Sequence, residues 1–88
     1  MDIREKITEV LEKDVADIFM LELDYVASHH DMRFREDLAA SSVQYFPIIS
    51  TLEEEFDLEI DFHEFQNEGR TIELAIDFVV DLYKAHYK

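Results

Sequence analysis

The 88-residue sequence contains no cysteine, no tryptophan, one glycine and one proline. The absence of cysteine excludes a disulfide framework and any metal site built from thiolates. No apolar run approaches the roughly 20 residues that span a bilayer, so we expect no membrane insertion. The first residues lack the basic-then-apolar order of a secretion signal. At this length, the sequence predicts a single domain over residues 1–88. Because neither a membrane span nor a secretion signal is recognised, a cytoplasmic location is the default expectation.

Basic residues are also scarce. Eight lysines and arginines stand against 22 aspartates and glutamates, which gives a formal net charge of −14. A surface of this charge repels nucleic-acid phosphates and anionic lipids but attracts basic protein surfaces. Hydrophobic residues nevertheless make up 48% of the chain, too many for an acidic disordered tail. The composition therefore indicates a folded domain with basic protein partners, and it argues against nucleic-acid binding.

Two segments, one at each end of the chain, have the apolar spacing of amphipathic helices. The first begins after Asp2, a suitable N-cap with Glu5 as its capping-box partner, and the other begins after Thr71. The apolar stripe of the first helix is Ile3, Ile7, Val10, Leu11, Val15, Ile18 and Phe19. The stripe of the last helix is Ile72, Ala75, Ile76, Val79, Val80, Tyr83 and Tyr87.

A further helix is predicted over Ser42–Phe56, with Ser41 as its N-cap. Its inward face would be Tyr45, Ile49, Leu52 and Phe56, flanked by Val43 and Ile48. Pro47 conflicts with this helix, because an interior proline loses an amide hydrogen bond and clashes with the preceding turn. Either the helix bends at Pro47, or it begins near Pro47 as a first-turn residue.

The remaining segments connect these helices. Between the first two helices the periodicity is lost, and we expect a long structured connection with the apolar anchors Leu23, Val26, Met32 and Phe34. Between the second and third long helices we expect at most one short helix near residues 61–66, with Gly69 marking the next boundary. The predicted fold class is an all-α four-helix bundle of three longer helices and one short helix.

The stretch "FREDLAASSVQYFPIISTLEEEFDLEI" resembles a pattern found in acyl carrier proteins. That pattern is Phe-x-x-Asp-Leu-Gly-x-Asp-Ser-Leu, followed downstream by Leu-Glu-Glu-Glu-Phe. The residues in register are Phe34, Asp37, Leu38, Leu52, Glu53, Glu54, Glu55, Phe56, Glu59 and Ile60. "TIELAIDFV" is similar to the opening of the family's last helix, so the resemblance covers nearly the whole chain. It implies an acidic helical bundle that is a carrier, not an enzyme.

The resemblance implies that Ser42 carries a 4'-phosphopantetheine arm derived from coenzyme A, with Ser41 as the second choice. The arm's thiol would hold an acyl or related intermediate in fatty-acid, lipid or specialised-metabolite biosynthesis. Ser41 would cap the helix, and no histidine lies at a spacing that would make Ser42 a catalytic nucleophile. The alternative is an unmodified acidic adaptor module with the same fold.

Several positions depart from the family pattern. Ala39 replaces the glycine after Asp-Leu, Ser41 replaces the aspartate, and Val43 replaces the leucine after the modified serine. Gln44 and Pro47 occupy positions that commonly hold docking acids, and the first connection is longer than in typical members. These departures favour a specialised carrier with dedicated partners.

By the same resemblance, the partners would be a phosphopantetheinyl transferase and acyl-transfer or condensing enzymes with basic docking surfaces. We expect the protein to be a monomer. The candidate docking residues are Gln44, Glu53, Glu54 and Glu55. The candidate residues for an acyl chamber are Val43, Tyr45, Phe46 and Ile49. For the two aromatic residues, core packing is the preferred interpretation.

No metal site is predicted. "DLEIDFHEF" resembles the second half of an EF-hand calcium loop, but Leu58 stands where the loop needs glycine. An acidic loop with Phe62 and Phe65 packed inward is the preferred interpretation. The four histidines do not have the spacing of metal ligands, and we interpret them as surface or loop residues.

Overall fold

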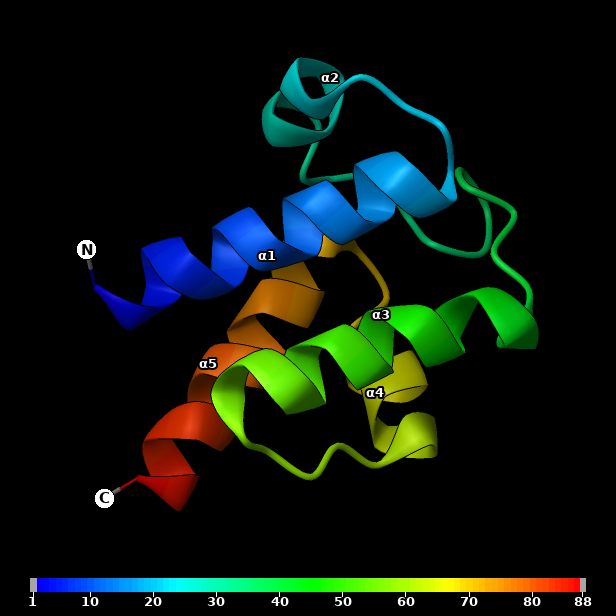
Figure 1. The fold of residues 1–88 in the computed structure, drawn as a ribbon. Coiled ribbons are helices and arrows are strands. Elements are labelled where there is room, and N and C mark those ends of the chain that lie inside the picture. Colours follow the sequence, from blue (N-terminus) through cyan, green and yellow to red (C-terminus); the bar gives the residue numbers. More distant parts are fainter. Residues whose placement is uncertain (1, 88) are drawn as a thin grey trace.

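The computed structural model describes residues 2–87 and consists of five α-helices (Figure 1). They are α1 (Ile3–Ile18), α2 (Leu23–Ser28), α3 (Ser42–Phe56), α4 (Phe62–Glu68) and α5 (Ile72–His86). Within residues 2–87 the single β-type pairing is an isolated bridge between Arg33 and Thr71. The predicted all-α helical bundle is confirmed.

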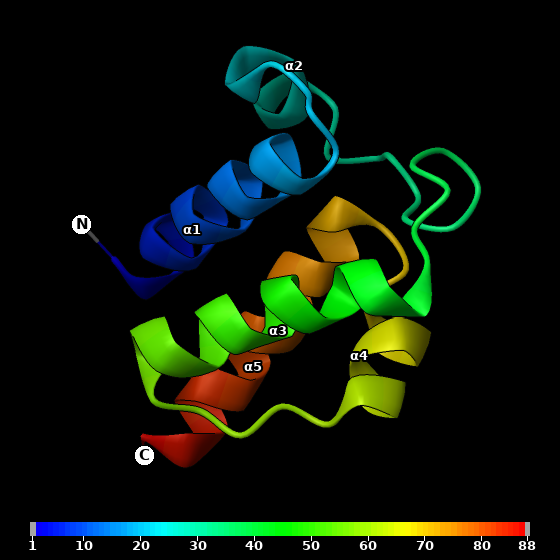
Figure 2. The same cartoon turned by 45° about the vertical axis from the view of Figure 1, so that its right-hand side comes forward.

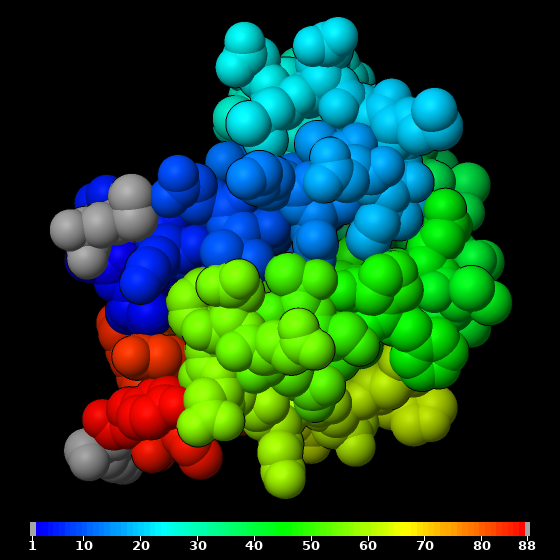
Figure 3. All heavy atoms as spheres, viewed as in Figure 1, coloured from blue at the N-terminus to red at the C-terminus, as the bar shows by residue number. Residues whose placement is uncertain are grey.

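The three long helices form the body of the molecule. α1 packs against both α3 and α5, and α4 packs against α5 and the adjacent part of α3 (Figures 1 and 2). α2 packs on α1, away from the rest of the bundle, and projects from it in the space-filling view (Figure 3). Across residues 2–87, none of the helices has the length and apolar character needed to cross a lipid bilayer.

The core is built from the apolar stripes of these helices. Its largest fully buried side chains include an aromatic cluster of Phe34, Tyr45 and Phe65, with ring centroids 5.7 to 6.5 Å apart. Phe34 comes from the first connection, Tyr45 from α3 and Phe65 from α4. Tilted and edge-on aromatic pairs at these distances add to the free energy gained by burying the rings. The cluster therefore joins three segments that are separate in sequence.

Polar caps fix the helix starts that the sequence predicts. The Asp2 carboxylate accepts the Glu5 N–H at 2.8 Å, and the Thr71 hydroxyl accepts the Leu74 N–H at 3.1 Å. Asp61 caps α4 by accepting the N–H of a residue in its first turn at 2.9 Å. Each cap satisfies an amide that has no partner inside its helix.

α3 begins at Ser42 and continues through Pro47. The alternative in which the helix begins near Pro47 is therefore wrong. Pro47 lies on the exposed side of α3, where water can serve the Val43 carbonyl that a proline cannot pair. One turn later, the Thr51 hydroxyl donates to the Pro47 carbonyl at 2.9 Å.

Two expectations are corrected by the structure. The helix α2 was not predicted, and Leu23 is not an anchor, because it begins α2 and is 48% exposed while Val26 is fully buried. Tyr87 is not part of the buried stripe of α5, because it lies beyond the helix end and is 46% exposed. Its hydroxyl donates to the carbonyls of Phe56 and Asp57, at the end of α3.

His30 ties the first connection to two long helices. One ring nitrogen is hydrogen-bonded to Glu12 of α1 at 2.5 Å, and the other lies 3.3 Å from Glu73 of α5. Glu73 also pairs with Arg4, which reaches Asp77 as well at 2.8 Å. His30 is thus a bridging residue, a role that its sequence context does not reveal.

Candidate functional site

The segment that leads into α3 is held by a compact turn. The Asp37 carboxylate accepts the Arg33 N–H at 2.7 Å, and the Asp37 and Leu38 N–H groups donate to the Arg33 carbonyl at 2.9 and 3.1 Å. The Arg33 side chain also reaches the same carboxylate at 3.3 Å. Hydrogen bonds from the Arg33 side chain and backbone lower the pKa of Asp37. The carboxylate is therefore fixed as the anion that closes the turn.

Ala39 follows this turn with φ of 53°, in the left-handed region. A non-glycine residue there costs roughly 1–2 kcal/mol, so glycine is the residue that this backbone favours. The next N–H, that of Ala40, donates to the Phe34 carbonyl at 2.8 Å. This conformation directs the chain from the turn to the start of α3.

Ser41 is the N-cap of α3, as the sequence predicts. The Gln44 side chain accepts the Ser41 N–H at 2.8 Å, and the Ser41 hydroxyl donates to the same Gln44 oxygen at 3.3 Å. The side-chain hydrogen bonds at the start of α3 join Ser41 and Gln44. Within residues 2–87, the Ser42 side chain makes no hydrogen bond. Ser42 is thus the first helical residue, and its side chain is exposed.

The four candidate chamber residues do not gather around one space. Val43 and Phe46 face outward with 74% and 56% exposure, and Phe46 stacks on Phe62 at 5.0 Å. Tyr45 and Ile49 are buried in the core on the opposite side of α3. This division follows the helical period, which separates positions 43 and 46 from 45 and 49.

The candidate docking residues also differ from one another. Gln44 is engaged in the cap of α3, and Glu53 accepts the Ile60 N–H at 3.0 Å. Glu54 and Glu55 are exposed and have their side chains available to solvent. At 1.5 Å per residue, they lie roughly 18–20 Å along α3 from Ser42. A partner that contacts both ends must cover most of the helix.

A cavity of about 180 Å³ lies beside the first turns of α3. Its walls are Arg35, Glu36, Tyr45, Gln66, Asn67 and Arg70. Burial raises the pKa of the Tyr45 phenol, and the nearby Arg35 acts in the opposite direction. The sequence gives no signal for this cavity, because the two arginines come from different connections and meet only through the fold.

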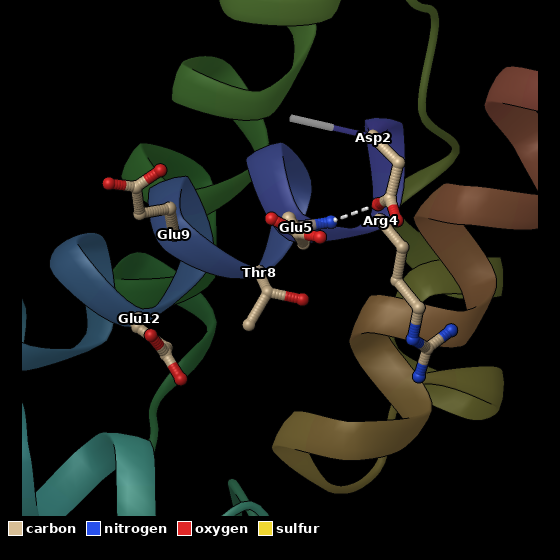
Figure 4. A pocket seen from close by; sticks show the side chains of 6 residues that line it. All are labelled: Asp2, Arg4, Glu5, Thr8, Glu9 and Glu12. Atoms are coloured by element: carbon tan, nitrogen blue, oxygen red, sulfur yellow. Dashed lines mark hydrogen bonds between the residues drawn. The ribbon is translucent and has the colours of Figure 1, made fainter.

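A larger hollow of about 390 Å³ runs along α1 and is shown in Figure 4. Its walls are Asp2, Arg4, Glu5, Thr8, Glu9 and Glu12. Arg4 extends from α1 toward α5, where its carboxylate partners lie (Figure 4). The hollow is acidic and shallow, and in residues 2–87 no group of three or more metal-ligating side chains comes together.

The chain was compared with protein-family models, curated proteins and solved structures. None of the three comparisons found a significant match. The functional interpretation therefore rests on the residues of this chain and on their geometry.

Proposed function

We propose that the protein is a carrier in which Ser42 bears a phosphopantetheine arm. The arm would be joined through a phosphodiester to the Ser42 Oγ by a transferase that uses coenzyme A. Its terminal thiol would then present an acyl or related group to partner enzymes. The protein itself would perform no catalysis.

The observation that carries this proposal is the position of Ser42. It is the exposed first residue of α3, and α3 alone among the five described helices has no acidic residue in its first turn. The positive end of the helix dipole is therefore not neutralised locally. A phosphodiester at this place would be stabilised by roughly 0.3–1 kcal/mol.

The approach to Ser42 supports the same proposal. The family pattern has glycine at the position of Ala39, and the backbone there is left-handed, the conformation that favours glycine. The first aspartate of the family pattern corresponds to Asp37, whose carboxylate accepts the Arg33 N–H and closes the turn. The resemblance to acyl carrier proteins is thus supported by the backbone geometry of this loop as well as by its sequence.

The surroundings of Ser42 suit contact with a second protein. Val43 and Phe46, three residues apart on one face of α3, expose apolar surface, and Glu54 and Glu55 are exposed near the end of the helix. With a net charge of −14, the protein would be drawn to basic surfaces, and complementary charge mainly raises the rate of association. We propose basic transferase and acyl-transfer enzymes as these partners.

The test is the intact mass of the protein after incubation with a phosphopantetheinyl transferase and coenzyme A. We expect the mass of one arm to be added to the unaltered protein and to Ser41→Ala, and no addition to Ser42→Ala. Ser41→Ala is the matched control because it removes the neighbouring hydroxyl of the same size. Circular dichroism of both variants checks that α3 is retained.

Addition of the arm to Ser42→Ala but not to Ser41→Ala would move the attachment site to Ser41. A complete lack of modification with several transferases would contradict the proposal and favour the unmodified acidic adaptor. That adaptor would keep partner binding in Ser42→Ala, which pull-down with a basic partner enzyme measures.

A further inference from the structure

The four arginines of this protein fall into two pairs. Arg4 contacts Glu73 and Asp77, and Arg33 contacts Glu36 and Asp37, all within 4.0 Å. Arg35 and Arg70 have no carboxylate within that distance among residues 2–87. They are also the two arginines that line the 180 Å³ cavity beside α3. In so acidic a protein, two unpaired guanidinium groups at one cavity require an explanation.

Backbone hydrogen bonds bring these two arginines to the same cavity. Arg35 follows Phe34, whose N–H donates to the Arg70 carbonyl at 3.0 Å. The adjacent bridge between Arg33 and Thr71 holds the same two segments of the backbone side by side. Arg35 and Arg70 are thus brought together by the main chain, while both side chains remain exposed to solvent.

The other walls add hydrogen-bonding groups of neutral charge. Tyr45 contributes its phenol from α3, and Gln66 and Asn67 contribute carboxamides from the end of α4. The Gln66 carboxamide nitrogen is buried and has no hydrogen-bond partner within residues 2–87. An unsatisfied buried donor is uncommon. Rotation of the Gln66 side chain toward the cavity would bring this donor within reach of an oxygen of a bound group.

We propose that this cavity is a binding site for a small oxyanion, the carboxylate or phosphate group of a small molecule. Arg35 and Arg70 would hold its oxygens through paired N–H donors, the geometry in which guanidinium groups recognise planar or tetrahedral oxyanions. Tyr45 and the two carboxamides would complete the hydrogen bonds. The volume of about 180 Å³ has room for several water molecules, hence for a group of that size.

The site would select its ligand against the charge of the whole protein. A net charge of −14 repels anions at long range, but that field is screened beyond roughly 8–10 Å at physiological salt. Glu36 is the one acid on the cavity wall, and its nearest cation is Arg33 at 3.8 Å. Among the residues that line the cavity, two arginines therefore stand against one glutamate, which leaves an excess of positive charge on the cavity wall.

The proposal holds whether or not Ser42 is modified, and it is tested on the unmodified protein. Acetate and inorganic phosphate are titrated separately at constant ionic strength, with chloride as the balancing ion, and amide NMR shifts are followed. We expect saturable shifts at Arg35, Gln66, Asn67 and Arg70 with at least one of the two anions. Which anion saturates at the lower concentration distinguishes a carboxylate ligand from a phosphate ligand.

Arg35→Gln and Arg70→Gln should each weaken this binding by about tenfold, the loss expected for one charged hydrogen-bonding partner. Lys13→Gln is the control: it removes one positive charge from an exposed position on α1 that does not line the cavity, and it should change affinity less than about twofold. Melting curves of all three variants verify folding. Shifts that never saturate, or that Lys13→Gln reduces as much as Arg35→Gln does, would overturn the proposal.

Discussion

The two connections of this fold both run between long helices and both contain a short helix, yet they are attached to the core in different ways. The first, residues 19–41, exposes the large apolar side chains of Met20, Leu23 and Tyr25. The second, residues 57–71, has no large apolar side chain that is exposed in the described structure, and Leu58, Ile60 and Phe65 are buried. The first connection is thus loosely packed over its α2 half.

The second half of the first connection is different again, because it is bound to the second connection and to the start of α5. The Phe34 N–H donates to Arg70, the Ile72 N–H to Met32 at 3.2 Å, and the Glu73 N–H to His30 at 2.9 Å. This seam positions both Arg35 and the turn that leads to Ser41. The proposed sites therefore depend on residues 30–41 and not on α2.

Phe34→Ala should break this seam and have the largest effect. The ring is fully buried between Tyr45 and Phe65, and truncation of a buried phenylalanine costs about 3–5 kcal/mol of unfolding free energy. Chemical denaturation with an unchanged m-value measures the loss. Leu23→Ala, in the exposed half of the same connection, should cost less than about 1 kcal/mol. Equal losses would show that α2 is as important to stability as the seam.

Gly69→Ala probes the tight end of the second connection. A Cβ at this position would lie 2.9 Å from the Phe65 carbonyl oxygen and 3.1 Å from the Ala75 Cα, both backbone atoms. Because neither can move without shifting a helix, we expect a loss of about 1–3 kcal/mol in denaturation. Glu68→Ala, the exposed preceding residue, should stay within about 0.5 kcal/mol of the original protein. A Gly69→Ala protein of undiminished stability would mean that α4 and α5 can separate freely.

Sequence reasoning succeeded where the signal is local. Apolar spacing and caps at Asp2 and Thr71 predict α1 and α5, and Ser41 predicts the start of α3. α2 was not predicted because it is short and has no side-chain cap, so its sequence carries no local helix signal. The helix is instead stabilised by the packing of its buried residue Val26 against α1. Helical spacing alone also predicted that Tyr87 is buried. The prediction failed because α5 ends at His86, and Tyr87 is the exposed residue that follows the helix.

The candidate site also has features that the sequence predicts and features that it does not. The exposure of Ser42 at the first position of α3 follows from the cap, and the burial of Tyr45 follows from the period of the helix. The cavity could not be predicted, since Arg35 and Arg70 meet through long-range backbone hydrogen bonds that leave no pattern in either segment. The proposed attachment of an arm to Ser42 stays a prediction.

Ala39→Gly should produce a small gain in stability. Ala39 holds a left-handed backbone in the turn of the first connection, and glycine removes that strain while adding flexibility to the unfolded chain. The net effect should be a stabilisation of about 0.5–1 kcal/mol, seen as a higher denaturation midpoint with the same m-value. Ala40→Gly is the control, because Ala40 has no positive φ and should lose roughly 0.5–1 kcal/mol. If both variants lose a similar amount of stability, the backbone at Ala39 is not strained. The proposed correspondence of Ala39 to the glycine of the acyl carrier pattern would then lose its structural support.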